Sequence, residues 1–361
     1  MRAYNFAAGP AALPDEVLEQ ARAELLNWEK TGASVLEIGH RTEQFMALAE
    51  QSKQDLRELM AIPKNYQILF LAGGGQHQFA MVPLNLLGRS AALEADYIDT
   101  GIWSHKAIVE AERYGKINIA ANAASENFER IPDFSSWRPN PNAAYLHYAQ
   151  NETIGGLEFP YIPEVSVPLV TDMTSSILSE PLDVSRFGII YAGAQKNISA
   201  AGLTIVIIRD DLLNYALPFT PTIFTYKTHA EANSLFNTPP VFAWYLASLV
   251  FAWLKRQGGV KKMGELNREK SSLLYSIIDN SNGFYRNKID HRYRSRMNVP
   301  FNLATADLEH LFIKEAASAN LINLKGHKLS GGIRASLYNA VTLKATQTLG
   351  TFMQDFAKRY G

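Results

Sequence analysis

The sequence predicts an α/β fold in which a mainly parallel sheet is flanked by helices and followed by a small α+β domain. Between residues 66 and 208, short apolar runs alternate with longer segments, which is the pattern of strands joined by crossovers. Several runs end in polar clusters, as expected where parallel strands form a ligand site. After Gly258-Gly259 the composition becomes more polar. We therefore expect an N-terminal arm (1–15), a large domain (16–259) and a small domain (260–361).

The composition restricts the possible partners. Lys plus Arg and Asp plus Glu number 35 each, so no net charge draws the chain to nucleic acid or to an anionic membrane, and a small metabolite is the expected partner. The absence of cysteine excludes disulfides, thiolate zinc sites and a cysteine nucleophile, and no metal site is predicted. The first residues lack the apolar core of a signal peptide, and the apolar stretch 244–254 is too short to span a bilayer. A soluble, cytoplasmic protein is expected.

The first predicted helix begins after Pro14, because apolar residues recur at helical spacing from there to Trp28. Thr42 is a candidate cap for a second helix, which places His40 and Arg41 just before a positive helix end. That position favours an anion, and an ordinary polar loop explains the two residues equally well.

A glycine turn follows the next predicted strand, residues 66–72. Strand, Gly73-Gly-Gly75-Gln76 and helix start form the geometry in which backbone N–H groups can hold a phosphate. A dinucleotide fingerprint requires a third glycine near position 78, where this chain has Gln78. The motif is therefore weak by itself.

Three further strands are predicted at residues 95–99, 143–148 and 167–171, and each leads into a polar cluster. The clusters contain Trp103, Thr153 and Asp172. An indole just past a strand end can stack on a flat ligand, although such a tryptophan more often caps a core. Because parallel strands end at the same edge of a sheet, we expect the clusters to form one crevice.

Lys196 lies on a short connection between two apolar runs, 187–191 and 203–208. Apolar surroundings favour the neutral amine, which suits imine formation with a carbonyl compound or with pyridoxal phosphate. A solvated lysine at a strand end is the alternative, and this segment alone favours that alternative.

The C-terminal third begins with Thr238-Pro239-Pro240, which is predicted to start a helix with Thr238 as its cap. That helix, 241–256, is apolar almost all round and is expected to be buried in a core or in a subunit contact. The basic stretch 286–296 could contact nucleic acid, but a solvated face is the preferred interpretation. The remaining predicted elements are a helix (265–278), a strand (296–301), a helix (307–319), a strand pair (near 326–328 and 333–338) and a final helix from residue 343.

The joint order of these candidates matches the requirements of pyridoxal phosphate. That cofactor needs a carboxylate for its ring nitrogen, a lysine for its aldehyde, a flat side chain for its ring and N–H groups for its phosphate. Nearly the whole chain resembles the phosphoserine aminotransferase family, a branch of the class V, fold-type I pyridoxal-phosphate enzymes. The motifs that carry the resemblance are NFAAGPAALP (5–14), GHR (39–41), GGGQ (73–76), NETIGG (151–156), YAGAQKN (191–197), FNTPP (236–240), SRMNVPF (295–301) and GGIRAS (331–336).

The resemblance implies a role for each candidate residue. Lys196 would bind the cofactor covalently, Asp172 would contact its ring nitrogen, and Trp103 would stack on the ring. The remaining implied contacts are Thr153 at the phenolic oxygen; Gly75, Gln76 and Gln195 at the phosphate; Asn237 and Thr238 at the phosphate of the other subunit's cofactor; His40, Arg41, His327 and Lys328 at the substrate's distal anion; and Arg334 at its α-carboxylate.

The implied enzyme is a homodimer with shared active sites and one pyridoxal 5'-phosphate per subunit. It would transfer the amino group of L-glutamate to 3-phosphohydroxypyruvate, giving O-phospho-L-serine for serine biosynthesis. It would also form 4-phosphohydroxy-L-threonine for pyridoxine biosynthesis. Alternatives are another class V aminotransferase, such as one acting on serine and glyoxylate, and a nicotinamide-dependent enzyme that uses the glycine turn. Many relatives carry arginine at positions 76 and 328, so Gln76 and Lys328 predict weaker phosphate recognition.

Overall fold

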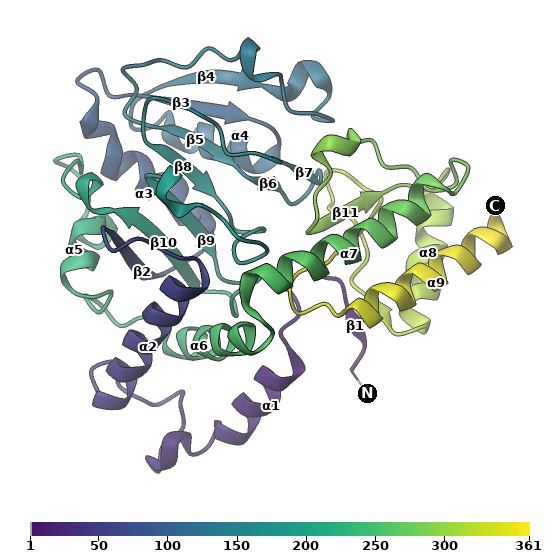
Figure 1. The fold of residues 1–361 in the computed structure, drawn as a ribbon, viewed down its shortest axis with the longest axis horizontal. Coiled ribbons are helices and arrows are strands. Elements are labelled where there is room, and N and C mark those ends of the chain that lie inside the picture. The colour runs from purple at the N-terminus through teal and green to yellow at the C-terminus, as the bar shows by residue number, and fades with distance from the viewer. Residues whose placement is uncertain (1) are drawn as a thin grey trace.

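The structure, a computed structural model, describes residues 2–361. A seven-stranded sheet in the order β2-β10-β9-β8-β5-β3-β4 forms the centre of the larger domain (Figure 1). Only β10 runs against its neighbours in this sheet, so the predicted mainly parallel α/β class is confirmed. The strands are β2 (Tyr66–Ala72), β3 (Glu94–Asp99), β4 (Lys116–Asn122), β5 (Leu146–Ala149), β8 (Leu169–Asp172), β9 (Ile189–Gly193) and β10 (Leu203–Arg209).

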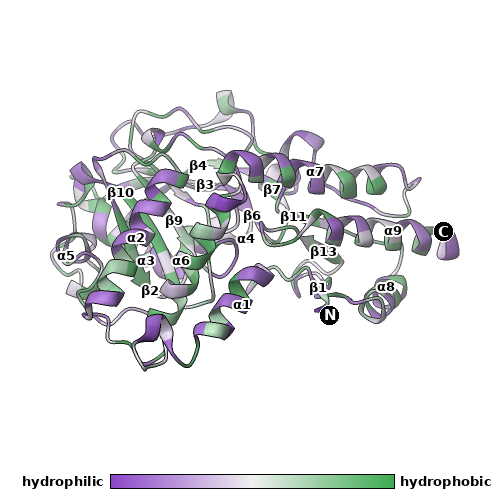
Figure 2. Cartoon of the chain, turned by 60° about the horizontal axis from the view of Figure 1, so that its bottom comes forward, coloured by the Kyte–Doolittle hydropathy of each residue, from purple (hydrophilic) through white to green (hydrophobic). Residues whose placement is uncertain are grey.

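Helices cover both faces of the sheet, which explains why its central strands are continuous apolar runs. One face packs against α1 (Asp15–Glu24), α2 (Glu43–Leu59) and α6 (Val241–Arg256), and the other against α3 (Gly75–Leu86), α4 (Ile102–Ala111) and α5 (Tyr226–Glu231). On the first face the Trp244 ring of α6 stacks on Phe70 of β2, with centroids 4.3 Å apart. The prediction that this apolar helix is buried is therefore confirmed, and Figure 2 shows the mainly hydrophobic strands between the helices.

The topology brings the ends of several strands to one edge. β2, β3, β5, β8 and β9 all run in the same direction, so the segments that follow them leave the sheet together. Because β10 runs back beside β9, with Thr204 opposite Gly193, the turn that joins them also lies at this edge. That turn carries Lys196.

The smaller domain is assembled from the C-terminal third and the N-terminal arm. Its elements are the second half of α7 (Gly259–Asp279), β11 (Asn298–Phe301), α8 (Ala306–Ser318), β12 (Leu321–Ile322), β13 (Ile333–Ser336) and α9 (Leu343–Tyr360). β1 (Tyr4–Asn5) pairs in parallel with β12, and Phe6 is buried in the same core. Met263 of α7 contributes to the large core and Leu274 to the small one, so α7 crosses the predicted boundary at 260 (Figure 1).

Three local predictions are wrong. Thr238 does not cap α6: the N-cap position is Pro240, without a side-chain cap, because the two prolines keep Thr238 outside the helix. Residues 326–328 form a loop, since Gly331 and Gly332 turn the chain with positive φ angles and only an isolated bridge, Lys325 to Ile333, remains. The first helix ends at Glu24, well before Trp28. The edge strand β4 has no counterpart among the predicted strands.

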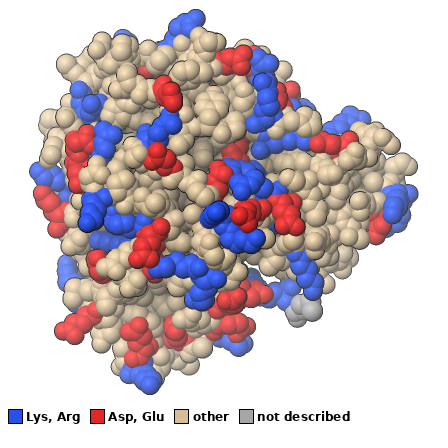
Figure 3. Space-filling view, viewed as in Figure 1, with Lys and Arg blue, Asp and Glu red and all other residues tan. Residues whose placement is uncertain are grey.

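The surface carries both charge signs in close mixture on the face seen in Figure 3. Within the basic stretch 286–296, Arg292 pairs with Asp290, Arg294 with Asp279, and Arg296 with Glu158 and Glu180. These arginines are thus neutralised inside the chain. From residue 2 to residue 361, each helix is too short or too polar to cross a membrane.

Candidate active site

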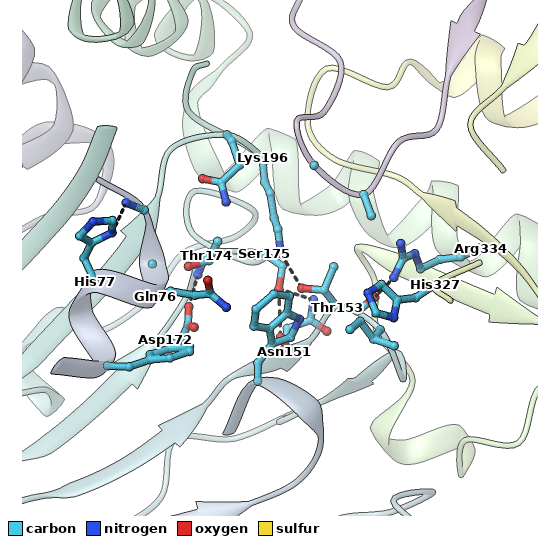
Figure 4. Close-up of a pocket in the computed structure, with 18 residues that line it drawn as sticks. Gln76, His77, Asn151, Thr153, Asp172, Thr174, Ser175, Lys196, His327 and Arg334 are labelled. Carbon is cyan, nitrogen blue, oxygen red and sulfur yellow. Dashed lines mark hydrogen bonds between the residues drawn. The ribbon is translucent and has the colours of Figure 1, made fainter. Parts of the chain in front are cut away.

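A cavity of about 450 Å³ lies where the shared strand edge meets the small domain (Figure 4). Its size falls in the usual range for small-molecule sites. It is lined by Ala8, Gly9, Gly74, Gly75, Gln76, His77, Phe79, Trp103, Asn151, Thr153, Ile154, Asp172, Thr174, Ser175, Gln195, Lys196, His327 and Arg334.

Lys196 reaches from the β9–β10 turn into this cavity (Figure 4). Its Nζ lies 2.5 Å from the hydroxyl oxygen of Thr153 and 5.9 Å from the centre of the Trp103 ring. Burial lowers the pKa of Lys196 to about 8, with Asp172 acting in the opposite direction and Arg334 adding to the decrease. About a tenth of the amine is therefore unprotonated at pH 7, far more than for an ordinary lysine, and this form is the nucleophile.

Asp172 is the last residue of β8, and its carboxylate is held by Thr174 in the turn that follows. Its Oδ1 accepts the N–H of Thr174 at 2.8 Å, and the Thr174 hydroxyl in turn accepts the N–H of Gly193 at 3.1 Å. Burial raises the pKa of Asp172, whereas the Thr174 hydrogen bonds and the charge of Lys196 lower it. A cationic group placed against this carboxylate would favour its charged form.

The glycine turn forms a close-walled cradle beside Asp172. A Cβ on Gly75 would lie 2.8 Å from the Thr174 hydroxyl, and one on Gly193 would lie 2.9 Å from the Gly75 nitrogen. Side chains are therefore excluded at both positions. Gly75 begins α3, whose first backbone N–H groups and dipole favour an anion at this point. His77 orders the turn, since its Nδ1 accepts the N–H of Gly74 at 3.1 Å.

The small domain supplies a guanidinium and an imidazole at the other end of the cavity. Arg334 of β13 donates from Nη1 to the backbone oxygen of Thr153 at 3.2 Å, and His327 lies beside it (Figure 4). Burial, followed by the charges of Arg334 and Lys328, lowers the pKa of His327. The cavity thus has an amine at its centre and a guanidinium at the small-domain end.

The structure brings together nine of the predicted site residues and leaves five apart. Gly75, Gln76, Trp103, Thr153, Asp172, Gln195, Lys196, His327 and Arg334 line the cavity, whereas His40, Arg41, Asn237, Thr238 and Lys328 do not. The expected cluster of His40, Arg41 and His327 is not formed within one chain, because the loop before α2 belongs to the large domain, away from β13. Asn237 lines a separate cavity of about 240 Å³ together with His77.

Comparisons with known proteins place this site in a family. The profile of the family "Aminotransferase class-V" matches residues 3–349. The chain is 55% identical to a phosphoserine aminotransferase of Laribacter hongkongensis, covering all of both chains. It is also 55% identical to that of Pseudomonas aeruginosa strain PAO1, covering all of this chain and 99% of the other. The chain belongs to the phosphoserine aminotransferase family of class V. It is accordingly a pyridoxal-phosphate-dependent aminotransferase.

Solved structures agree with this assignment. The aminotransferase superposes on a phosphoserine aminotransferase from Bacillus circulans with a TM-score of 0.97 at 43% identity, covering all of this chain and 99% of the other. A pyridoxal-phosphate-bound phosphoserine aminotransferase from Trichomonas vaginalis gives 0.94 at 40%, covering 98% and 100%. An alanine–glyoxylate aminotransferase from Nostoc shares the fold alone, at 14% identity and a TM-score of 0.75.

The residues of this aminotransferase's cavity fit the cofactor. A buried amine of lowered pKa suits the aldehyde, a buried carboxylate suits the ring nitrogen, and a half-buried indole offers a flat face. The cradle at Gly75 and Gly193 suits a phosphate, because it lies at the start of a helix and has no room for a Cβ at either glycine.

Sequence reasoning missed several lining residues of the aminotransferase. Asn151, Thr174 and Ser175 lie in the polar clusters that follow strands, so a signal existed, but their polar side chains alone did not distinguish them. Asn151 donates to Ser175 and to Asn298 of the small domain at 2.9 and 2.8 Å. Gly9 had no such signal, because only the tertiary structure carries the N-terminal arm past Lys196.

Proposed function

We propose that this aminotransferase transfers the amino group of L-glutamate to 3-phosphohydroxypyruvate, giving O-phospho-L-serine and 2-oxoglutarate. One observation carries the proposal: a single cavity joins the Lys196 amine and the Asp172 carboxylate to an end that contains the Arg334 guanidinium and the His327 imidazole. Both substrates have an α-carboxylate and a second, distal anion. A site that binds two anionic groups therefore suits both substrates.

Pyridoxal phosphate supplies an electron-withdrawing ring that stabilises negative charge at the substrate's Cα when it is bound. Lys196 would hold the aldehyde carbon, and Asp172 would keep a proton on the ring nitrogen. Trp103 would cover one face of the ring, and Thr153 would contact the phenolic oxygen. Gly75, Gln76 and Gln195 would surround the phosphate.

Lys196 has a second task in this proposal. Its free amine would act as a general base toward the proton on the substrate's Cα, and its ammonium form would act as the general acid when the proton is returned. The lowered pKa of about 8 suits both directions, because the amine exchanges protons readily near neutral pH. Thr153, 2.5 Å away, orients the amine between these transfers.

Arg334 would bind the α-carboxylate that both substrates share, because its guanidinium can form two parallel hydrogen bonds with a carboxylate. The hydrogen bond from Arg334 to the Thr153 backbone oxygen holds the guanidinium close to Thr153, whose hydroxyl contacts the Lys196 amine. His327 and Lys328 would bind the distal anion. A γ-carboxylate and a phosphate are both accepted, since these side chains respond to charge more than to shape.

We propose that a second copy of the chain completes each site. His40, Arg41, Asn237 and Thr238 do not line the cavity of their own chain, yet each is suited to an anion. Large apolar side chains near Asn237 are exposed, namely Ile223 and Phe236. Burying them against a partner would be favourable, which supports a homodimer with shared active sites.

The proposal extends to 3-hydroxy-2-oxo-4-phosphonooxybutanoate, whose amination gives 4-phosphohydroxy-L-threonine for pyridoxine biosynthesis. This compound has the same α-keto acid and the same terminal phosphate, separated by one more carbon. The groups that would bind it are those already named, and none of them requires a fixed spacer length.

An acceptor panel tests the substrate assignment. With L-glutamate as donor, kcat/KM is measured for 3-phosphohydroxypyruvate, 3-hydroxy-2-oxo-4-phosphonooxybutanoate, hydroxypyruvate and glyoxylate. Since a site built to bind a polar group rejects analogues that lack it, we expect the phosphorylated acceptors to be preferred by roughly 10²- to 10⁴-fold. A preference for glyoxylate, with serine as the better donor, would instead assign the chain to the serine–glyoxylate type.

A further inference from the structure

Glu152 is a buried carboxylate that contacts the first turn of α4 from another part of the chain. It ends the short strand β6 (Asn151–Glu152), which pairs with β7 (Leu157–Glu158). Its Oε2 accepts the N–H of Trp103 at 3.0 Å. Its Oε1 accepts the N–H and the hydroxyl of Ser104, both at 2.8 Å. The side chain is only 1% exposed.

The charge of Glu152 is compensated by the helix. The first N–H groups of an α-helix lack partners within the helix, and the helix dipole makes this end positive. Burial raises the pKa of Glu152, whereas the bonds from Ser104 and Trp103 lower it. Gly101 allows the close approach, since a Cβ there would lie 2.6 Å from the carboxylate carbon. The carboxylate thus serves as a cap supplied from outside the helix.

Two short links connect this cap to the reacting groups. Through Trp103, the carboxylate fixes the residue that would cover the cofactor ring. Through the next residue along the chain, Thr153, it is joined to the Lys196 amine, 2.5 Å from the threonine hydroxyl. Glu152 therefore lies at the junction between the element that carries the indole and the residue that orients the amine.

We propose that Glu152 is a positioning residue that sets the placement of the Trp103 indole relative to the Lys196 amine. The proposal rests on the cofactor-stacking role given to Trp103 under the proposed function. Its chemical basis is that small displacements of reacting groups reduce rates strongly. The negative charge of Glu152 also raises the pKa of Lys196, so the residue has an electrostatic effect that a purely structural cap would lack.

Glu152→Gln tests the proposal in the enzyme loaded with pyridoxal phosphate. The amide keeps the volume but places an NH₂ group against the N–H groups of α4, so the first turn must shift. We expect the visible circular dichroism of the bound cofactor, which reports its asymmetric surroundings, to lose most of its amplitude. We also expect the pH midpoint of the cofactor's visible absorption to move down, and kcat to fall on the order of ten- to a hundredfold.

Glu158→Gln is the matched control. Glu158 lies opposite Asn151 in the same hairpin, is also buried, and pairs with Arg296 instead of α4. Its variant should leave the cofactor's circular dichroism and pH midpoint as in wild type, even if the protein becomes less stable. If Glu152→Gln does not fold, Glu152→Asp gives the circular-dichroism comparison, because its shorter side chain cannot reach both α4 residues. The pH midpoint should then stay as in wild type, since the charge is kept.

A double variant separates the possible outcomes. If Glu152 acts through Trp103, adding Glu152→Gln to Trp103→Phe should reduce the circular dichroism little further. Wild-type signals in Glu152→Gln, or equal losses in Glu152→Gln and Glu158→Gln, would overturn the proposal. If Trp103→Phe itself leaves the signal unchanged, the stacking role of Trp103 fails first. The cofactor signals need no substrate, so they are independent of the substrate assignment.

Discussion

The side-chain oxygen of Asn197 accepts the backbone N–H of Asn339 at 3.0 Å, which ties the residue after Lys196 to the turn between β13 and α9. The Asn339 side chain donates to the backbone oxygen of Leu178 and accepts from Asn267 of α7, both at 2.9 Å. All three asparagines are buried. The small domain is therefore joined to the Lys196 turn by a connected series of amide hydrogen bonds.

This network predicts strong coupling between Asn267 and Asn339. Each single change to alanine leaves a buried amide without its partner, whereas the double change removes both. We expect the two effects on the free energy of unfolding to differ from additivity by about 0.5–3 kcal/mol, measured by chemical denaturation in a double-mutant cycle. Additive effects would mean that the two side chains act independently.

Lys196→Ala is expected to abolish transamination without unfolding the protein. The amine serves both in holding the cofactor and in moving the Cα proton, and loss of general acid–base catalysis alone costs about 10²- to 10⁴-fold. The rate should be measured with glutamate and 3-phosphohydroxypyruvate, with far-UV circular dichroism as the folding control. Turnover near the wild-type rate without an added amine would contradict the role of Lys196.

Lys328→Arg is expected to lower KM for 3-phosphohydroxypyruvate more than KM for glutamate. A guanidinium can pair with two phosphate oxygens at once, and the expected gain is up to roughly tenfold, or about 1.4 kcal/mol. Arg334→Lys is the contrasting variant, because the loss of its fork should raise KM for both substrates. If Lys328→Arg changes both KM values equally, or neither, position 328 does not contact the phosphate.

Lys270 of α7 is expected to stabilise the small domain in a pH-dependent way. Its buried ammonium donates to the backbone oxygens of Leu337, Tyr338 and Val341 at 2.8–3.0 Å. Lys270→Met removes one donor from each of these oxygens, of which that of Tyr338 keeps the N–H of Val341, and this loss should cost about 1–3 kcal/mol or more. The exposed Lys261→Met on the same helix should stay within about 0.5 kcal/mol of wild type.

The pH dependence follows from the Lys270 pKa, which burial lowers to about 7. Above pH 7 the native state binds fewer protons at this residue than the unfolded chain does, up to the ordinary pKa of lysine. Stability from this group therefore rises with pH between about 7 and 10, by up to about 1.4 kcal/mol per pH unit. The difference in unfolding free energy between wild type and Lys270→Met should widen from pH 7 to 9. A constant difference would contradict the lowered pKa.

Complementation tests the shared active site. One parent is Lys196→Ala, and the other is Asn237→Ala/Thr238→Ala, assayed at limiting cofactor. With co-expression, random pairing makes about half of the dimers mixed, and one of their two sites is then wholly wild type. Activity should reach roughly a quarter of wild type, well above either parent. If verified mixed dimers give only the parental average, Asn237 and Thr238 serve their own chain.

The sequence by itself determined most strands of the large domain, although not β4, and the residues at their ends. Strands such as β2 and β10 are short, apolar and bounded by turn residues, so local pattern was sufficient to predict them. The same argument placed Asp172 and Lys196 at one edge, because strand direction follows from the crossovers between strands. Motif resemblance then supplied the family, which the comparisons confirm.

Only the tertiary structure decided which side chains meet across distant segments. The contact of Glu152 with α4 joins residues about 50 positions apart, and the pairing of β1 with β12 joins the N-terminal arm to the small domain. The periodicity of apolar residues along the chain does not predict such contacts, because the position of each hydrogen-bond partner depends on the whole fold. The loop near His327 and the start of α6 were mispredicted for a related reason. Glycine permits many backbone conformations and proline fixes φ, but neither residue specifies which segment the chain packs against.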